Sequence, residues 1–308
     1  MCGFANDKSP NYLNDYKIPY LVGFPDFKPV EIEDKQIFDE FFLKYPPSIS
    51  EFTFTNIFSW RLAKKHEFSV LDSHLIISFF ASSKRKFYQP VGAIPEKIML
   101  KIFEKFPDSS FERVEKGVAE KLTNLNVRHD RDMDDYIYKL SELMELKGDK
   151  YSPKRNFIRR CEEYSPQVCI LDDDTAESFF EMQEKWCSIR NCSADKSLYA
   201  EDIAVKEALA NFKEFNLFGI CVRINNKIAA FAIGEPLNKN TFVEHFEKAD
   251  PSFVGIHQYL LHKFVSKIPE RFEFINREQD LGIEGIRKSK LSYYPIRIVE
   301  KFSVRKKS

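Results

Sequence analysis

One order of segments occurs twice along this chain and limits the folds that it can adopt. The second half shows two helical apolar patterns, an alternating hairpin, a strand, a helix and a short strand. The first half repeats this order in a weaker form. The expected segments are 174–190, 201–212, 218–234, 241–248, 254–265 and 271–276, matched by 32–45, 53–62, 68–80, 87–90, 95–106 and 110–114. The sequence predicts an α+β protein of two tandem units, 20–146 and 147–308, each with a mixed, mainly antiparallel sheet flanked by helices.

Size and charge exclude several classes of protein. A chain of 308 residues can bury two apolar cores, so it needs neither disulfides nor a structural metal to fold. Its 47 acidic and 47 basic residues balance, which argues against attraction of the whole chain to nucleic acid. No apolar run is long enough to span a membrane and the N-terminus lacks the apolar stretch of a signal peptide, so we expect a cytoplasmic protein.

The cysteines and histidines do not indicate a metal site. The six cysteines match the spacing of neither a zinc ribbon nor a redox pair, and we expect reduced, mostly buried thiols. Cys2 would be an N-terminal nucleophile after removal of Met1, but we favour a start that lies upstream of the folded region. The histidines are too scattered to nominate metal ligands: His66, His74, His129, His257 and His262.

Four motifs resemble one known family and occur in its order. They are EFTFTNIFSWR, KYSPKRNFIRR, HFEKADP and NREQDLGIEGIRKSKLSYYP. Together they are similar to the C-terminal domain of phosphatidylglycerol lysyltransferase, from about residue 22 to 305. The resemblance implies two tandem GNAT-like (acyl-CoA N-acyltransferase) units, with the Fem-type aminoacyltransferases as more distant relatives.

The resemblance also implies an activity. Both groups of enzymes move an aminoacyl group from a charged tRNA to an acceptor, at a cleft between or within the two units. Their Gly-Ile-x-Gly-like segment, followed by a basic residue, is matched here by 282–285 and then by Lys288 and Lys290. The membrane-spanning half of the lipid enzymes does not occur in this sequence, so the acceptor stays open.

Acyl transfer requires a base for the nucleophile's proton, donors for the oxyanion and positive charge for the donor's phosphates. Alternation along the strand 241–248 places His245 and Glu247 on one face. We predict that this carboxylate orients or charges the imidazole, which then takes a proton. The alternative is a polar strand end, or a structural ion pair with Lys248.

The stretch after strand 271–276 supplies further candidates. Ligand crevices open at the carboxyl ends of buried strands, which favours catalytic roles for Asn276, Glu278 and Asp280. The candidates for binding the donor in this stretch are Arg277, Gly282, Gly285 and Lys290. The two glycines indicate close approach of backbone or ligand, and the lysine is predicted to contact a phosphate or the oxyanion.

A basic helix is a second candidate for donor binding. Helical spacing after Lys154 stacks Arg155 and Arg159 into a fork that suits two phosphates of CoA or tRNA. The alternative is a solvated basic helix. The segment DPSFVGIHQ lies where a GNAT fold binds pyrophosphate at a helix N-terminus, but Gly255 is its only glycine, which argues against CoA.

These features favour one function over two others. We expect an aminoacyltransferase in which the second unit carries the chemistry and the first is a scaffold for acceptor binding. The alternatives are an acetyl-CoA-dependent N-acetyltransferase and a non-catalytic binding module. Expected partners are the acceptor end of tRNA or an acyl-CoA as donor, and a small molecule, peptide or lipid head group as acceptor. No covalently bound cofactor is expected, and the oligomeric state is open.

Overall fold

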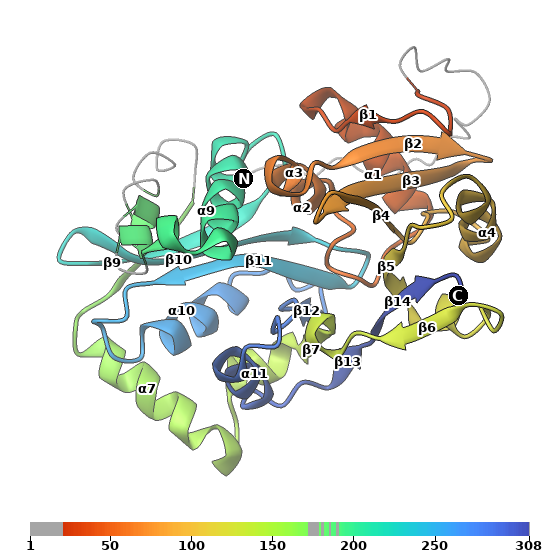
Figure 1. Ribbon diagram of the computed structural model, residues 1–308. Helices are drawn as coiled ribbons and strands as arrows, with labels where there is room; N and C mark the ends of the chain where they lie inside the picture. The colour runs from red at the N-terminus through yellow and green to blue at the C-terminus, as the bar shows by residue number, and fades with distance from the viewer. Residues whose placement is uncertain (1–20, 172–178, 180–181, 185, 189–190, 308) are drawn as a thin grey trace.

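The chain folds into two mixed sheets, as the computed structural model shows for residues 21–171, 179, 182–184, 186–188 and 191–307 (Figure 1). The strands of this part of the chain are Lys28–Pro29 (β1), Glu67–Leu71 (β2), His74–Ala81 (β3), Lys84–Tyr88 (β4), Phe111–Glu115 (β5), Asn126–His129 (β6), Asp135–Lys139 (β7), Gln167–Ile170 (β8), Phe218–Ile224 (β9), Lys227–Pro236 (β10), Thr241–Ala249 (β11), Phe274–Asn276 (β12), Arg297–Val299 (β13) and Lys301–Arg305 (β14). Sheet A has the order β1-β2-β3-β4-β5-β14-β6, and sheet B the order β13-β7-β12-β11-β10-β9-β8. In each sheet one pair of strands is parallel, β4 with β5 and β11 with β12. The predicted α+β class with two mainly antiparallel sheets is confirmed.

Helices cover both sheets and fill the space between them. They are Lys35–Lys44 (α1), Phe54–Ser59 (α2), Arg61–Lys64 (α3), Pro95–Lys105 (α4), Lys116–Ala119 (α5), Leu140–Glu145 (α6), Ser152–Glu162 (α7), Lys196–Ala210 (α9), Ile256–Val265 (α10) and Glu284–Leu291 (α11). One face of sheet A packs on α4 and α5, and one face of sheet B packs on α6, α7 and α10. The other faces meet through α1, α2 and α9.

Both predicted hairpins form, and for the expected reason. The β2–β3 turn holds Asp72 and Ser73 at φ of 47° and 59°, and the β9–β10 turn holds Asn225 and Asn226 at 52° and 61°. Residues of these types tolerate positive φ better than most others, since their short polar side chains can hydrogen-bond locally. The turns therefore set the register of the central strands in both sheets.

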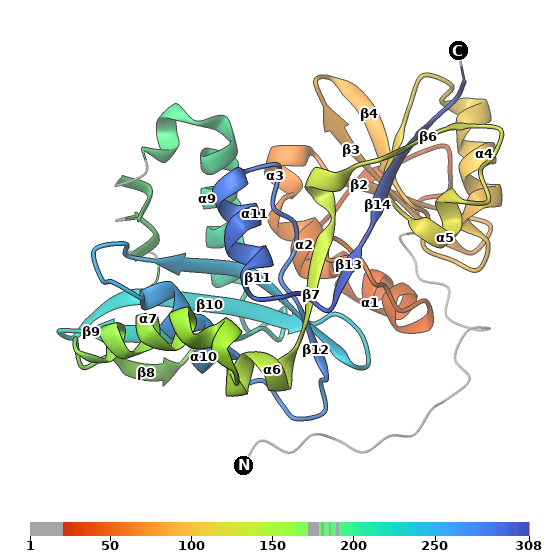
Figure 2. The same ribbon diagram turned by 90° about the horizontal axis from the view of Figure 1, so that it is seen from below.

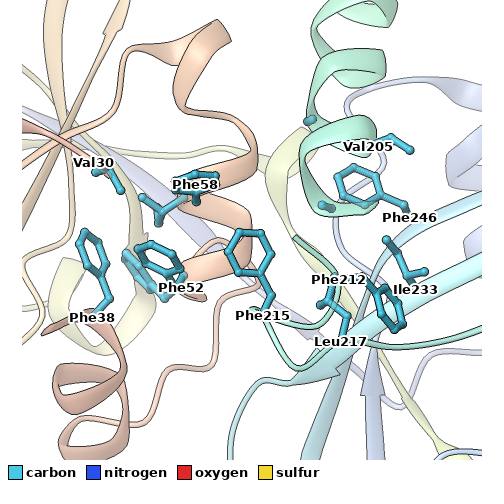
Figure 3. Close-up of a cluster of buried hydrophobic side chains, with 14 of the residues drawn as sticks. Val30, Phe38, Phe52, Phe58, Val205, Phe212, Phe215, Leu217, Ile233 and Phe246 are labelled. Atoms are coloured by element: carbon cyan, nitrogen blue, oxygen red, sulfur yellow. The ribbon is translucent and has the colours of Figure 1, made fainter. Parts of the chain in front are cut away.

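The two units share one apolar core. Phe215, which follows α9, packs edge-on against Phe54 and Phe58 of α2, with ring centroids 5.8 and 5.4 Å apart. Figure 3 shows Phe215 reaching from the side of Phe212 and Leu217 toward that of Phe52 and Phe58. Burial of such rings is worth about 2 kcal/mol or more each, so the units are packed together rather than loosely linked.

The sheets divide the chain differently from the predicted boundary at 146–147. β7 belongs to the first segment but pairs in sheet B with β12 and β13, while β14 belongs to the last segment but pairs in sheet A with β5 and β6. Figure 2 shows β7 beside β13. The strand before β7 is β6 and the strand after β13 is β14, and these two pair with each other in the other sheet. This two-stranded ribbon joins the sheets because its strands carry buried residues for both cores, Tyr136 and Tyr138 for sheet B and Val304 for sheet A.

The prediction of reduced cysteines is wrong for one pair. Cys187 and Cys192 form a disulfide, with Cα atoms 5.0 Å apart, because the turn at Asn191 (φ 54°) brings the two together. Cys161, Cys169 and Cys221 are free. The N-cap proposed for helix 174–190 and the proposed role of Cys2 lie outside the described residues. No helix in the described part of the chain is long and apolar enough to cross a bilayer.

Candidate functional site

The stretch that follows β12 forms the centre of the candidate site. Asn276, fully buried at the end of β12, donates from Nδ2 to Asp135 Oδ2 at 3.0 Å and accepts the backbone N–H of Glu278 at 2.8 Å. Glu278 adopts a positive φ of 55°. This turn directs Arg277 and Glu278 to different partners, so one short loop serves two charged clusters. Asn276 therefore positions the loop, and it has no exposed surface for a catalytic role.

A β-bulge in β11 decides which residues face these clusters. Ile233 of β10 pairs with Phe246, but Gly234 pairs with Glu244, which leaves His245 as the extra residue. Gly234 is required there, since a Cβ atom would lie 2.0 Å from the Val243 carbonyl oxygen. The bulge breaks the expected alternation along the strand. The predicted pair of His245 with Glu247 is therefore wrong, and so is an ion pair between Glu247 and Lys248, which bonds Glu201 at 2.8 Å.

The first cluster encloses His245 between two carboxylates. Its Nδ1 lies 2.8 Å from Glu278 Oε1, and its Nε2 lies 2.9 Å from Glu235 Oε1 and 3.3 Å from Thr53 Oγ1 at the start of α2. Burial lowers the pKa of His245, but the hydrogen bonds to Glu235 and Glu278 outweigh burial and raise the pKa to about 9. The imidazole is thus charged at neutral pH, and both its nitrogens are occupied. It cannot act as the predicted base.

Glu278 has the properties that His245 lacks. Only Oε1 of its carboxylate bonds the imidazole, and Oε2 has no hydrogen-bond partner within the described part of the chain. The side chain is 17% exposed, which leaves it accessible to a ligand. Burial raises the pKa of the Glu278 carboxyl, against the lowering effect of His245. A carboxylate with a raised pKa and a free oxygen is a suitable general base.

The second cluster holds Arg277 between two other carboxylates. Its Nε donates to Glu244 Oε2 at 2.5 Å and its Nη2 to Glu247 Oε2 at 2.6 Å. His257 of α10 lies against Glu247, with Nδ1 2.7 Å from Oε1. Burial opposes ionisation, but Arg277 and His257 hold the pKa of Glu247 at about 2, while burial raises the pKa of Glu244 to about 7 despite Arg277. Glu247 therefore orients Arg277 and His257 and does not assist His245.

Lys290 of α11 is fixed against the same loop. Its Nζ donates to the carbonyl oxygen of Arg277 and, at 2.6 Å, to that of Gln279. The third N–H of this ammonium has no partner among the described residues. Burial and the neighbouring Arg277 lower the pKa of Lys290 to about 8. The ammonium of Lys290 is thus partly buried with one unused donor, and its role in binding a developing negative charge stays a prediction.

Asp280 and Gly282 hold the loop in place. Asp280 is fully buried, and it accepts hydrogen bonds from Tyr136 Oη at 2.5 Å, Arg287 Nε at 2.8 Å and the Gly282 backbone N–H at 2.9 Å. Burial opposes its ionisation, yet Arg287 and Tyr136 lower its pKa to about 2. Gly282, at φ 73°, approaches Asp132, but nothing lies within 4 Å of a Cβ atom at Gly285. The nearest atoms to Gly282 belong to a side chain and Gly285 has none, so the predicted approach of backbone or ligand is not seen at either glycine, and its ligand part stays a prediction.

The predicted basic fork does not form on α7. Arg155 Nη1 donates to the carbonyl oxygens of Leu146 and Gly148, capping the end of α6, and Arg159 bonds Asn156 on its own helix. Lys154 alone reaches the site, through Ser292 Oγ at 2.5 Å and the Tyr293 ring at 4.0 Å. The prediction that Arg155 and Arg159 form a fork for phosphates is therefore wrong, because Arg155 bonds nearby backbone carbonyl groups instead.

A third cluster, which sequence reasoning missed, lies under the loop where the ribbon crosses between the sheets. Lys301 is fully buried, and its Nζ bonds Glu51 Oε2 at 2.5 Å and Asp135 Oδ1 at 2.6 Å. Arg113 Nε donates to Glu51 Oε1 at 2.5 Å. Burial opposes ionisation of Glu51, but Lys301 and Arg113 lower its pKa to about 2. The sequence gives no clear signal for this cluster, since Lys301 begins a strand, 301–305, that also contains Ser303 and Arg305.

Among the described residues, no group of three or more His, Cys, Asp and Glu side chains is arranged to hold a metal ion. The site combines the Glu278 carboxylate with two fixed cations, Arg277 and Lys290. The fold of two sheets that share one core also occurs in solved structures. L-PGS from Bacillus licheniformis has it, with a TM-score of 0.64 at 12% identity over 89% of this chain and 93% of that chain. FemX has it too, with a TM-score of 0.57 at 10% identity over 90% and 96%.

The chain belongs to the family described as phosphatidylglycerol lysyltransferase, C-terminal, which matches residues 43–305. The resemblance seen in its motifs is therefore confirmed. A conserved protein of unknown function from Bacteroides thetaiotaomicron is 32% identical, with a TM-score of 0.85 over 91% of this chain and 99% of that chain. An uncharacterised protein of Mycoplasmoides gallisepticum is 27% identical over 180 residues, 55% of this chain. The match covers 55% of that relative, so the chain spans about half its length.

Proposed function

We propose that the protein moves an aminoacyl group from a charged tRNA to an amine or hydroxyl acceptor. The family supports transfer of this kind, since its description names a lysyltransferase. The observation that carries the proposal is the loop after β12, which carries Glu278 with its free oxygen and whose carbonyl groups on either side of Glu278 hold the ammonium of Lys290. A base and an oxyanion donor are the two groups that attack on an ester requires.

The proposed step uses these residues in defined roles. The acceptor's nitrogen or oxygen attacks the ester carbonyl of the aminoacyl group, and Glu278 Oε2 takes the proton that it loses. Lys290 donates to the carbonyl oxygen as it becomes negative. Collapse of the intermediate breaks the bond to the ribose oxygen of the tRNA, which then takes up the proton. His245 stays charged throughout and holds the carboxylate of Glu278 in position.

Donor binding is assigned to the cations beside the loop. Lys154 and Arg277 both lie close to the ring of Tyr293, with Lys154 Nζ 4.0 Å and the Arg277 guanidinium 5.7 Å from its centroid. We propose that they attract the phosphates of the tRNA acceptor end. An acyl-CoA donor is less well supported, because Gly255 packs on the Phe157 carbonyl oxygen, 2.0 Å from where a Cβ atom would lie, and so serves contact with α7.

A binding titration separates this function from the two alternatives. Mobility shifts are measured with aminoacylated and deacylated tRNA at low and physiological salt, since charge attraction alone has a steep salt dependence. Tighter binding of the charged form at physiological salt supports aminoacyl transfer. Equal binding of both forms, or none, would contradict it. Acetyl-CoA turnover without tRNA binding would identify an acetyltransferase, and ligand binding without any turnover would identify a binding module.

A further inference from the structure

Two free cysteines face each other at the outer edge of sheet B. Cys169 on β8 pairs directly with Cys221 on β9 in an antiparallel register. The backbone bond from Leu171 N to Gly219 O, 2.9 Å long, lies two residues further along the same pairing. Cys169 and Cys221 therefore occupy a hydrogen-bonded pair, whose Cα atoms are about 5.5 Å apart in antiparallel sheets. Their thiols point to the same face of the sheet, toward the apolar core that the two sheets share.

This spacing suits a disulfide. Disulfide-bonded cysteines have Cα atoms about 4.4–6.8 Å apart, with Cβ atoms about 3.8 Å apart, whereas directly opposed residues hold their Cβ atoms at about 4.5–5.5 Å. A hydrogen-bonded pair lies at the wide end of that range, so closing the bond requires the two Cβ atoms to approach by roughly 1.5–2 Å. β8 can make this adjustment, because it is the last strand of sheet B and pairs with β9 alone among the described strands. Opening and closing the bond then needs no change in the central strands.

The surroundings give the two thiols different roles. Cys169 is partly exposed, whereas Cys221 is fully buried at the apolar core that the two sheets share. A reagent from solution therefore meets Cys169 first. Burial raises the pKa of the Cys221 thiol to about 11, and the positive charge of Arg223, two residues along β9 on the same face, opposes this rise. The third free cysteine, Cys161, is fully buried in the other core of sheet B.

We propose that Cys169 and Cys221 form a reversible thiol–disulfide exchange site whose substrates are low-molecular-weight disulfides. The Cys169 thiolate attacks one sulfur of the small disulfide, which forms a mixed disulfide and releases one thiol. Cys221 attacks Cys169 Sγ, and its proton passes to the departing thiolate, which leaves as the second thiol. One small disulfide is reduced to two thiols while the two cysteines are oxidised to one bond, so atoms and electrons balance. The site is independent of the proposed aminoacyl transfer.

The experiment uses the full chain, reduced and then equilibrated in glutathione buffers of increasing oxidised fraction. Free thiols are blocked, and the bonds are mapped by mass spectrometry of peptides prepared without reduction. We expect a Cys169–Cys221 bond in the wild type and in the matched control Cys161→Ser. Cys221→Ser should stop at a glutathione adduct on Cys169, and Cys169→Ser should lose the reaction at Cys221. Hydrogen exchange of the β8 amides should slow when the bond closes.

Two results would overturn the proposal. One is a wild-type protein that keeps a stable glutathione adduct on Cys169 while Cys221 stays a free thiol. The other is absence of reaction at both cysteines in the folded protein, with reaction only after unfolding. The wild-type peptide map decides between these and the expected bond by itself, so the answer does not depend on the folding of any variant.

Discussion

The ionisation of His245 should make the stability of the protein depend on pH in a defined way. The group has an ordinary pKa of 6.5 and a pKa raised to about 9 in the folded protein by Glu235 and Glu278, against the effect of burial. A folded-state pKa above the unfolded value means that protonation favours folding. The stabilisation is fully present below about pH 6.5 and is lost as the pH rises through about 9.

The size of this effect follows from the two pKa values. A difference of about 2.5 pKa units corresponds to about 3 kcal/mol, at 1.36 kcal/mol per unit. His245 is buried, so solvent screening reduces this value little. Lys64 and Lys290 oppose the effect, because burial lowers the pKa of each to about 8 and their loss of protons above that value favours the folded state. The wild-type curve alone therefore mixes opposite contributions.

The difference between two proteins isolates His245. Free energies of unfolding are measured by urea titration from pH 6 to pH 10 for the wild type and for His245→Gln, which keeps a polar side chain but does not titrate. We expect the gap between the two curves to narrow by about 3 kcal/mol from the low to the high end of this range. A gap that stays constant, or an NMR titration that places the imidazole pKa below 7, would refute the assignment of a charged histidine between two carboxylates.

Three substitutions test other parts of the account. Lys290→Met should slow transfer about 100-fold or more in single-turnover assays, because it removes the oxyanion donor. The control Lys288→Met, on the exposed side of α11, should not change the rate. Equal rates for the two variants would show that Lys290 has no part in the mechanism. Lys301→Met should lower the free energy of unfolding, measured by urea titration, by about 3–5 kcal/mol, because two buried carboxylates lose their cation. A loss under about 1 kcal/mol would mean that the cluster is not charged. Gly234→Ala should lower the free energy of unfolding by about 1–3 kcal/mol, because the added Cβ atom meets a carbonyl oxygen. The control Gly117→Ala, whose Cβ atom would have nothing within 4 Å, should be neutral or slightly stabilising. Equal melting temperatures of the two variants would contradict the bulge.

Much of the fold could be predicted because local chemistry specifies it. The turns at 72–73 and 225–226 carry residues that tolerate positive φ, and the helix at Pro95–Lys105 buries Ile98 and Ile102 on one face. The exchange of β7 and β14 between the sheets could not be predicted, because strand pairing depends on contacts between residues far apart in the chain. Tyr136, Ile137 and Tyr138 of β7 are all buried, so the strand has no alternation that would indicate which sheet receives it.

The site shows the same division between local and long-range information. The stretch from Asn276 to Lys290 was predicted from its position after a strand, and the structure brings its polar side chains together around one loop. The partners of His245 were missed because of one extra residue in β11. Beyond this bulge, each side chain of the strand points to the opposite face from the one that simple alternation predicts. Glu235 and Thr53 gave no signal of their own, since their role arises only where the two sheets meet.

The most direct test of the central claim is the rate at which a labelled aminoacyl group leaves charged tRNA, with hydroxylamine as a surrogate amine acceptor. The wild type should accelerate formation of the labelled hydroxamate above the uncatalysed rate. Glu278→Gln should reduce this acceleration by a factor of about 100 or more while charged tRNA still binds, and the exposed Glu284→Gln, in the same stretch, should match the wild type. No acceleration by the wild type would contradict aminoacyl transfer, and full activity of Glu278→Gln would contradict the assigned base.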